Sequence, residues 1–155
     1  MSATPPQSHT PTGATKPGRP GLSWWQAGGL AAVVTTLANL AVLLAGRAAG
    51  GSFAIDEGGG ETHEVTALVV AQFSAIPIVV GFGTAVLLAL VWSGVLRLAQ
   101  VVGAVLALAT IAGPVTSDVD VVTQVALSVM HVIPGVAIVW ALEVVRRRNV
   151  SATTS

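Results

Sequence analysis

Four polar side chains interrupt long apolar stretches of the sequence and are the best candidates for chemistry. They are Asn39, Gln72, Gln124 and His131. Histidine binds and releases a proton near neutral pH, and an amide both donates and accepts hydrogen bonds. Together these side chains form a candidate polar site inside the apolar part of the chain.

Two interpretations of this candidate polar site compete. In the structural one, Asn39, Gln72 and His131 bond to one another or to nearby carbonyls and fix the register of packed helices, at about 0.6 kcal/mol per contact. In the functional one, they line an outward-facing pocket, since an ionisable side chain deep in a membrane points to function. His131 has no second intramembrane acid or base with which to exchange a proton, which favours the structural interpretation.

Acidic side chains between the apolar stretches are the remaining candidates. Asp118 and Asp120 directly precede the last stretch and are expected at the outer mouth of the pocket. The run from Glu61 to Glu64 (ETHE) carries three ligands for a hard metal ion, but a Gly-rich loop does not fix their geometry. A solvated acidic loop is the better interpretation. With no cysteine and no His-Glu-x-x-His, Gly-x-Ser-x-Gly or Walker motif, we expect no metal, no cofactor and no enzymatic activity.

The elements that must hold these residues follow from composition. Of the 155 residues, 53% are hydrophobic and 9% are charged, and the mean hydropathy is +0.80. A soluble domain carries roughly 25% charged residues to wet its surface, so the solvent of this chain is a lipid bilayer. Four apolar segments are each long enough to cross a hydrocarbon core of roughly 30 Å. They cover about residues 25–46, 65–91, 98–115 and 121–142.

The sequence therefore predicts an all-α fold, an integral membrane four-helix bundle with a disordered N-terminal tail. Residues 1–23 are rich in Pro, Ser, Thr and Gly and cannot bury enough apolar area to fold. Residues 24–145 form one transmembrane domain, and residues 146–155 form a polar cytoplasmic tail. Between the first two spans we expect a Gly-rich acidic loop.

Small and polar residues recur at helical spacing along each predicted span, as they do where membrane helices pack closely. We expect these four stripes to meet at one central axis. They consist of Gly28, Ala32, Thr35, Thr36, Asn39 and Gly46; Ala67, Ala71, Ser74, Gly81 and Ala85; Gln100, Gly103, Ala107 and Pro114; and Gln124, Ser128, His131 and Gly135.

The charges orient the spans, because positive residues collect on the cytoplasmic side of membrane proteins. Placing the N-terminus inside leaves only Arg47 on the outside. The inside then holds Lys16, Arg19, Arg97, Arg146, Arg147 and Arg148, of which the last four are the expected topology anchors. The four tryptophans agree, since all of them fall at the cytoplasmic interface in this topology. Both termini are therefore expected in the cytoplasm.

Two stretches, one in the third span and one in the fourth, carry a resemblance to a known family. LALATIAGPV (residues 106–115) and VALSVMHVIPG (residues 125–135) resemble an actinobacterial family of small four-span membrane proteins, the domain-of-unknown-function family 6069. The end of the first span at Gly46-Arg47 and the acidic loop after it fit the same outline. The resemblance covers about residues 24–145. It implies a membrane location and this topology, and it supplies no activity, cofactor or partner.

The residues lead to one expected function and one alternative. The first is a non-enzymatic bundle, either an accessory subunit or a small-ligand binder, in a bacterial cell membrane. The alternative is a small oligomeric transporter or proton-coupled carrier that uses His131. A membrane enzyme acting on lipid is a third and weaker hypothesis. The net charge of zero excludes a basic face for nucleic acid, so the expected partners are the bilayer and either a second copy of the chain or another membrane protein.

Overall fold

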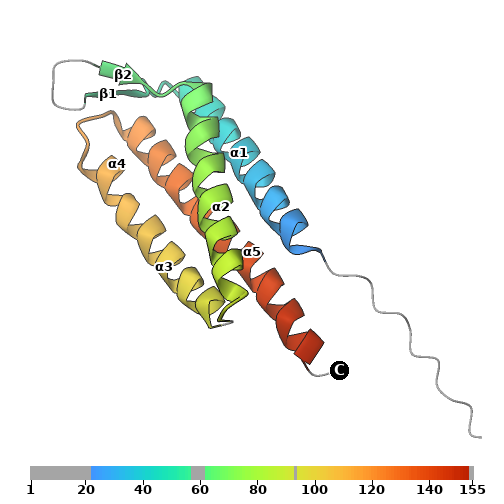
Figure 1. Ribbon diagram of the computed structural model, residues 1–155. Coiled ribbons are helices and arrows are strands. Elements are labelled where there is room, and N and C mark those ends of the chain that lie inside the picture. The colour runs from blue at the N-terminus through green and yellow to red at the C-terminus, as the bar shows by residue number, and fades with distance from the viewer. Residues whose placement is uncertain (1–21, 57–61, 93, 154–155) are drawn as a thin grey trace, which may run out of the picture.

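A bundle of helices with a small hairpin at one end makes up the described part of the chain (Figure 1). The computed structural model describes residues 22–56, 62–92 and 94–153, so nearly all of the predicted disordered tail lies outside the described residues. The elements in chain order are α1 (Trp24–Ala48), β1 (Ala54–Asp56), β2 (Thr62–Glu64), α2 (Ala67–Ala89), α3 (Val95–Thr110), α4 (Ala112–Thr116) and α5 (Val121–Thr153).

Within these described ranges, four helical segments are long and apolar enough to cross a membrane. They are Trp24–Ala48, Ala67–Ala89, Val95–Thr116 and Val121–Arg148. The predicted four-helix membrane fold is confirmed, and the chain is a multi-pass membrane protein. The third segment combines α3 and α4, which meet at Ile111. The helix breaks there because Pro114 lacks the amide that would bond the Thr110 carbonyl, and its ring crowds that carbonyl.

Polar caps set where three helices begin. The Ser23 hydroxyl accepts from the Gln26 amide (3.3 Å), and the Gln26 side chain accepts in return from the Ser23 amide (2.8 Å). Thr66 and Asp120 cap α2 and α5 by accepting from the amide three residues further on, at 3.3 and 2.8 Å. Each cap satisfies an amide that the helix itself leaves without a partner.

The helix of the fourth span continues beyond the predicted end of the span. The sequence placed that end near residue 142, where charged residues begin, and α5 continues as a helix to Thr153. Glutamate and arginine are good helix formers, and Glu143 pairs with both Arg146 and Arg147 at 2.7 Å. Charge ends the apolar part of a span without ending the helix.

The four spans do not share one axis, contrary to the sequence-based expectation. Helix α1 packs along both α2 and α5, whereas α3 packs chiefly along α5 and, within the described residues, makes no contact with α1. The closest approach of α3 and α5 is at Gly135, where a Cβ atom would lie 2.5 Å from the Ala107 Cβ. Small residues at this crossing let the two backbones approach, as in other membrane helix pairs. Helix α3 is therefore attached mainly to α5, with a smaller contact to α2.

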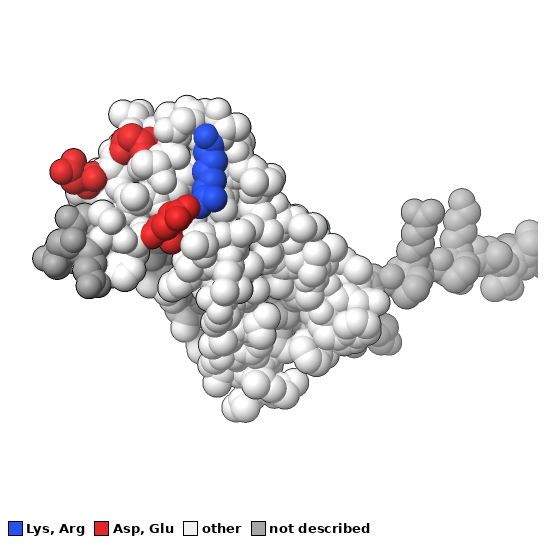
Figure 2. All heavy atoms as spheres, turned by 90° about the horizontal axis from the view of Figure 1, so that it is seen from above, with Lys and Arg blue, Asp and Glu red and all other residues white. Residues whose placement is uncertain are grey.

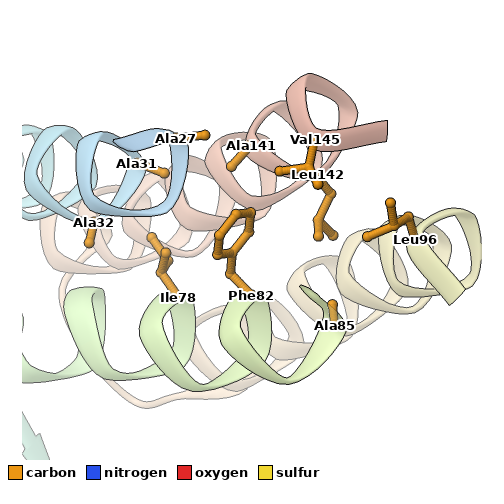
Figure 3. Packing of buried hydrophobic residues seen from close by; sticks show 10 residues of the cluster. All are labelled: Ala27, Ala31, Ala32, Ile78, Phe82, Ala85, Leu96, Ala141, Leu142 and Val145. Carbon is orange, nitrogen blue, oxygen red and sulfur yellow. The ribbon is translucent and has the colours of Figure 1, made fainter. Parts of the chain in front are cut away.

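Two apolar clusters stabilise the bundle, one at each end. The cluster far from the hairpin surrounds the Phe82 ring, which extends from α2 towards α1 and α5 (Figure 3). Its members are Ala27, Ala31, Ala32, Ile78, Phe82, Ala85, Leu96, Ala141, Leu142 and Val145. The cluster beneath the hairpin comprises Leu43, Phe53, Val65, Val70, Ala126, Leu127 and Met130. Of the candidate polar site, Asn39 and His131 lie between the residues of these two clusters along α1 and α5.

Candidate functional site

Two paired strands lie in the segment between α1 and α2, where the sequence predicted only a loop. Strands β1 and β2 pair antiparallel, with Ala54 opposite Glu64 and Asp56 opposite Thr62. Phe53, just before β1, is completely buried and has a left-handed backbone (φ 51°). Its ring lies against Gly46 of α1, where a Cβ atom would come within 2.6 Å of it. This ring fixes the hairpin to the end of the bundle.

Asp120 ties the same hairpin to α5. Its Oδ2 accepts from the amide (2.9 Å) and the hydroxyl (2.8 Å) of Ser52 and from the hydroxyl of Thr123 (2.7 Å). The Thr123 hydroxyl in turn accepts from the Phe53 amide (3.1 Å). The bonds from the Thr123 hydroxyl and the Ser52 amide hold the pKa of Asp120 well below its usual range, because they favour the charged carboxylate. We call Ser52, Phe53, Asp120 and Thr123 the hairpin latch.

A salt bridge holds the other side of the hairpin. Arg47, at the end of α1, donates to the Glu64 carboxylate at 2.6 Å and to the Val65 carbonyl at 3.2 Å. The view onto this end shows acidic side chains beside a basic one, and the other described residues in view are uncharged (Figure 2). The hairpin is thus attached to both α1 and α5.

A cavity of about 940 Å³ lies beneath the hairpin. Helix α5 forms its floor, α2 and α3 form its walls, and β2 and α4 close the hairpin end. Most of its lining is apolar. The polar residues in the lining are Asn39, His63, Glu64, Ser74, Thr110, Ser117 and His131. Phe73, Val102 and Leu106 line it as well and are exposed on the surface of the bundle, so the cavity opens sideways between α2 and α3. In a bilayer that opening faces the acyl chains.

Asn39, at 4% exposed, is with Ser74, at 2%, one of the two buried polar residues described in the lining of this cavity. Its Nδ2 donates to the Ser74 hydroxyl (2.8 Å) and to the Met130 carbonyl (3.1 Å), which links α1 to α2 and α5. Its Oδ1 is buried without a partner in the described structure, and so is the hydroxyl of Thr35 one turn earlier. A buried acceptor without a donor costs roughly 1–3 kcal/mol, which a bound group could recover.

His131 lies in the cavity wall, half-buried, and bonds within its own helix. Its Nδ1 is 2.7 Å from the Leu127 carbonyl. A carbonyl only accepts, so Nδ1 carries the proton and Nε2 of the neutral ring is an acceptor. Both Asn39 and His131 therefore bond to carbonyls, as the structural interpretation predicted, and both also line a cavity, as the functional one predicted.

The other predicted site residues lie elsewhere. Gln72 is exposed on α2 and does not line the cavity, so the bond predicted between it and Asn39 or His131 is not formed. Gln124 donates to the Val115 carbonyl (2.7 Å) and joins α4 to α5 outside the cavity. Asp118 is exposed, and neither it nor Asp120 lines the cavity. The structure therefore does not bring the two aspartates to this cavity, and Asp120 instead belongs to the hairpin latch.

His63 and Glu64 stand where the two aspartates were expected. The sequence indicated them only as part of a weak metal-binding run, and the hairpin brings them to the end of the cavity. Among the described residues, no three His, Cys, Asp or Glu side chains gather as metal ligands; Glu61 lies outside those residues. The hairpin register, which the sequence does not reveal, places His63 and Glu64 beside a pocket formed by the helices.

Comparison with known proteins decides the family. The model of a family of unknown function, DUF6069, matches residues 20–148, which is most of the chain. The chain belongs to this family. No curated protein matches it, and no solved structure does. The resemblance of residues 106–115 and 125–135 was therefore a correct guide. Since the DUF6069 description names no activity, a function has to be argued from the geometry of this member.

The four predicted anchor arginines of this DUF6069 member lie at the end opposite the hairpin. Arg146 and Arg147 bond Glu143, whose carboxylate also accepts from Gln100 of α3 (3.2 Å). Arg148 donates to the Leu22 carbonyl before α1, and Arg97 is exposed near the start of α3. One end of the bundle is thus basic and the other carries the acidic hairpin, which is the asymmetry that the predicted topology requires.

Proposed function

We propose that this chain is a non-enzymatic membrane protein that binds a small amphipathic ligand taken sideways from the bilayer. The cavity between α2 and α3 is the observation that carries the proposal. Ligand pockets have volumes of roughly 300–1,000 Å³ and are mostly apolar with a few placed polar groups. A cavity of about 940 Å³ with Asn39 and His131 in its wall has this character.

Two glycines of α2 provide the test. Gly81 lines the cavity, and a Cβ there would meet Ile138 at an ordinary 3.4 Å, so Gly81→Phe extends a ring into the cavity. Gly83 does not line the cavity, and a Cβ there would meet nothing within 4 Å, so Gly83→Phe is the matched control.

Lipids that co-purify with the full chain in mild detergent are identified by mass spectrometry. We expect one amphiphile to be enriched with the wild type and with Gly83→Phe, and to be lost with Gly81→Phe. Equal lipid profiles for all three proteins would refute a ligand in this cavity.

The location proposed for this function is a bacterial cytoplasmic membrane, with both termini in the cytoplasm and the hairpin outside. Support comes from the arginines at one end of the bundle, since positive residues favour the cytoplasmic side. A reporter enzyme that is active only outside the cell, fused after residue 155, should be inactive. The same reporter inserted at Gly59 in the first loop should be active. The opposite pattern would invert the topology.

A proton-coupled carrier is the second candidate, favoured by the position of His131 in the cavity wall. Only His63 and Glu64 among the described lining residues could also exchange a proton, and both lie at the hairpin end. A carrier would therefore need a second copy of the chain, or another membrane protein, to complete a path across the bilayer. Proton flux into vesicles that depends on the protein and disappears in His131→Ala would support it. Equal flux with and without the protein would exclude it.

A further inference from the structure

The polar groups that face the cavity differ from those that most lipid head groups require. Head groups of common phospholipids are anionic or zwitterionic and are bound by Lys and Arg. Among the described lining residues there is neither a Lys nor an Arg. The one acid in the lining, Glu64, is paired with Arg47 at 2.6 Å. The cavity thus offers no charge for an ionic head group to neutralise.

What the cavity offers instead is hydrogen-bond acceptors. The amide of Asn39 cannot turn round, since its Nδ2 faces the Met130 carbonyl at 3.1 Å and a carbonyl accepts only. Both protons of Nδ2 are used by Ser74 and Met130, so Oδ1 remains as a buried acceptor without a donor. His131 adds a second acceptor, because its Nδ1–H is directed to Leu127.

The apolar lining is at the other end of the cavity. From the level of His131 the floor continues along α5 past Ile138 to Leu142, roughly 16 Å at 1.5 Å per residue. Over this length the facing walls are Ile78 and Gly81 of α2 and Ala99 of α3. The cavity therefore has a polar half beneath the hairpin and an apolar half towards the basic end, which fits a head and a chain.

We infer that the ligand is a neutral amphiphile whose head group is a hydroxyl, such as a long-chain alcohol, and that this hydroxyl donates to Asn39 Oδ1. This inference rests on the proposed function and specifies its ligand class. An ammonium head would also donate, but a cation at this depth would be buried without a free counter-charge. An anion would face the Glu64 carboxylate and the acceptors of Asn39 and His131, with no Lys or Arg among the described lining residues to neutralise it. A hydroxyl supplies the missing donor without adding charge.

Three probes with the same chain and different heads test the inference. They are oleyl alcohol, oleyl methyl ether, which lacks the donor, and oleyl phosphate, which is anionic. Each competes with deuterated oleyl alcohol for the purified full chain in detergent, measured by native mass spectrometry. We expect the alcohol to bind about tenfold more tightly than either analogue, the value of one buried hydrogen bond. This comparison uses the wild-type protein, so it does not depend on whether a variant folds.

Two substitutions locate the bond. Asn39→Leu should reduce the preference for the alcohol over the ether to about one, while the exposed control Gln72→Leu should keep it. Equal binding of alcohol and ether by the wild type, or tightest binding of the phosphate, would overturn the hydroxyl assignment and leave amphiphile binding intact. If none of the probes binds and no amphiphile co-purifies, the proposed function fails as well.

Discussion

The bundle has a tightly packed side and a loosely packed side. In the apolar windows of α2 and α5, 33% of residues are buried, and in that of α1 28% are; in the third span, formed by α3 and α4, the figure is 6%. The packed side comprises α1, α2 and α5 around Phe82, whereas the loose side is α3 attached to α5 with the cavity beside it.

This difference separates stability from binding within one small fold. Helices in lipid gain little from burying apolar area, because acyl chains solvate the same surface, so close packing has to hold them together. Three mutually packed helices supply that packing. The fourth then need not fill the remaining space, and the volume it leaves is available to a ligand. The Asn39–Ser74 bond lies on the boundary between the two sides.

Truncating one aromatic residue on each side of α2 should give the largest difference in the free energy of unfolding between the two sides of the bundle. Phe82 is 4% exposed in the packed side, while Phe73 is 74% exposed at the rim of the cavity. Phe82→Ala should lower the free energy of unfolding by about 2–3 kcal/mol, somewhat less than in a soluble core, because lipid solvates the unfolded reference state. Phe73→Ala should change it by less than about 0.5 kcal/mol. Reversible unfolding in mixed micelles measures both, and similar losses would abolish the distinction between the sides.

A single added methyl group should disrupt the contact between α3 and α5. Gly135→Ala places a Cβ atom 2.5 Å from the Ala107 Cβ, and overpacking of this kind costs about 1–3 kcal/mol. Because α3 is held mainly by α5 and does not contact α1 within the described residues, we expect it to move rather than the packed helices. Increased hydrogen exchange confined to residues 95–110 would show this. Ala107→Gly in the same chain should restore protection, and a loss spread over α1 and α2 would contradict the attachment of α3 mainly to α5.

The number and length of the spans could be predicted from the sequence, and the direction in which a side chain points around its helix could not. Counting residues along apolar segments gave four spans with boundaries close to those observed, since the bilayer fixes their length. By the same counting, Asn39 and Gln72 each lie seven residues from the outer end of a predicted span, which predicts one depth for both. Only Asn39 faces the interior, because α2 directs Ser74 inwards and Gln72, two residues and about 200° away, outwards. Packing between helices decides that rotation, and spacing within one helix does not reveal it.

The small-residue stripes were ambiguous for a similar reason. Gly103 and Ala107 of α3 have the spacing of a closely packed face, and they do pack, but against α5 alone. The sequence of α3 does not indicate that this helix lacks contact with α1. The position of His63 and Glu64 at the cavity could not be predicted either, since it depends on a hairpin register fixed by Phe53 and Asp120. Contacts between segments far apart in sequence determined each of these features.

Disrupting the hairpin latch should expose the polar end of the cavity and leave the packing of α1, α2 and α5 unchanged. Asp120→Ala removes the acceptor for Ser52 and the cap of α5, so hydrogen exchange of the Ser52 and Phe53 amides should rise about tenfold. Asp118→Ala, at an exposed aspartate that does not line the cavity, should leave it unchanged. Since folding lowers the pKa of Asp120, its contribution is present above the ordinary aspartate pKa of about 4 and is lost as pH falls below it. A latch that weakens instead as pH rises would contradict this role.

The Asn39–Ser74 bond, on the boundary between the two sides, should contribute least to the free energy of unfolding. Ser74→Ala removes one acceptor of Asn39 and leaves the other, the Met130 carbonyl, so a loss of about 0.6 kcal/mol is expected, the average for such bonds in membranes. Ser128→Ala is the control, because the Ser128 hydroxyl bonds within its own helix, to the Gln124 carbonyl. A loss of several kcal/mol on Ser74→Ala would mean that Asn39 holds the bundle together. A small loss leaves Asn39 as a side chain whose remaining bonding capacity, the unpartnered Oδ1, is available to a ligand.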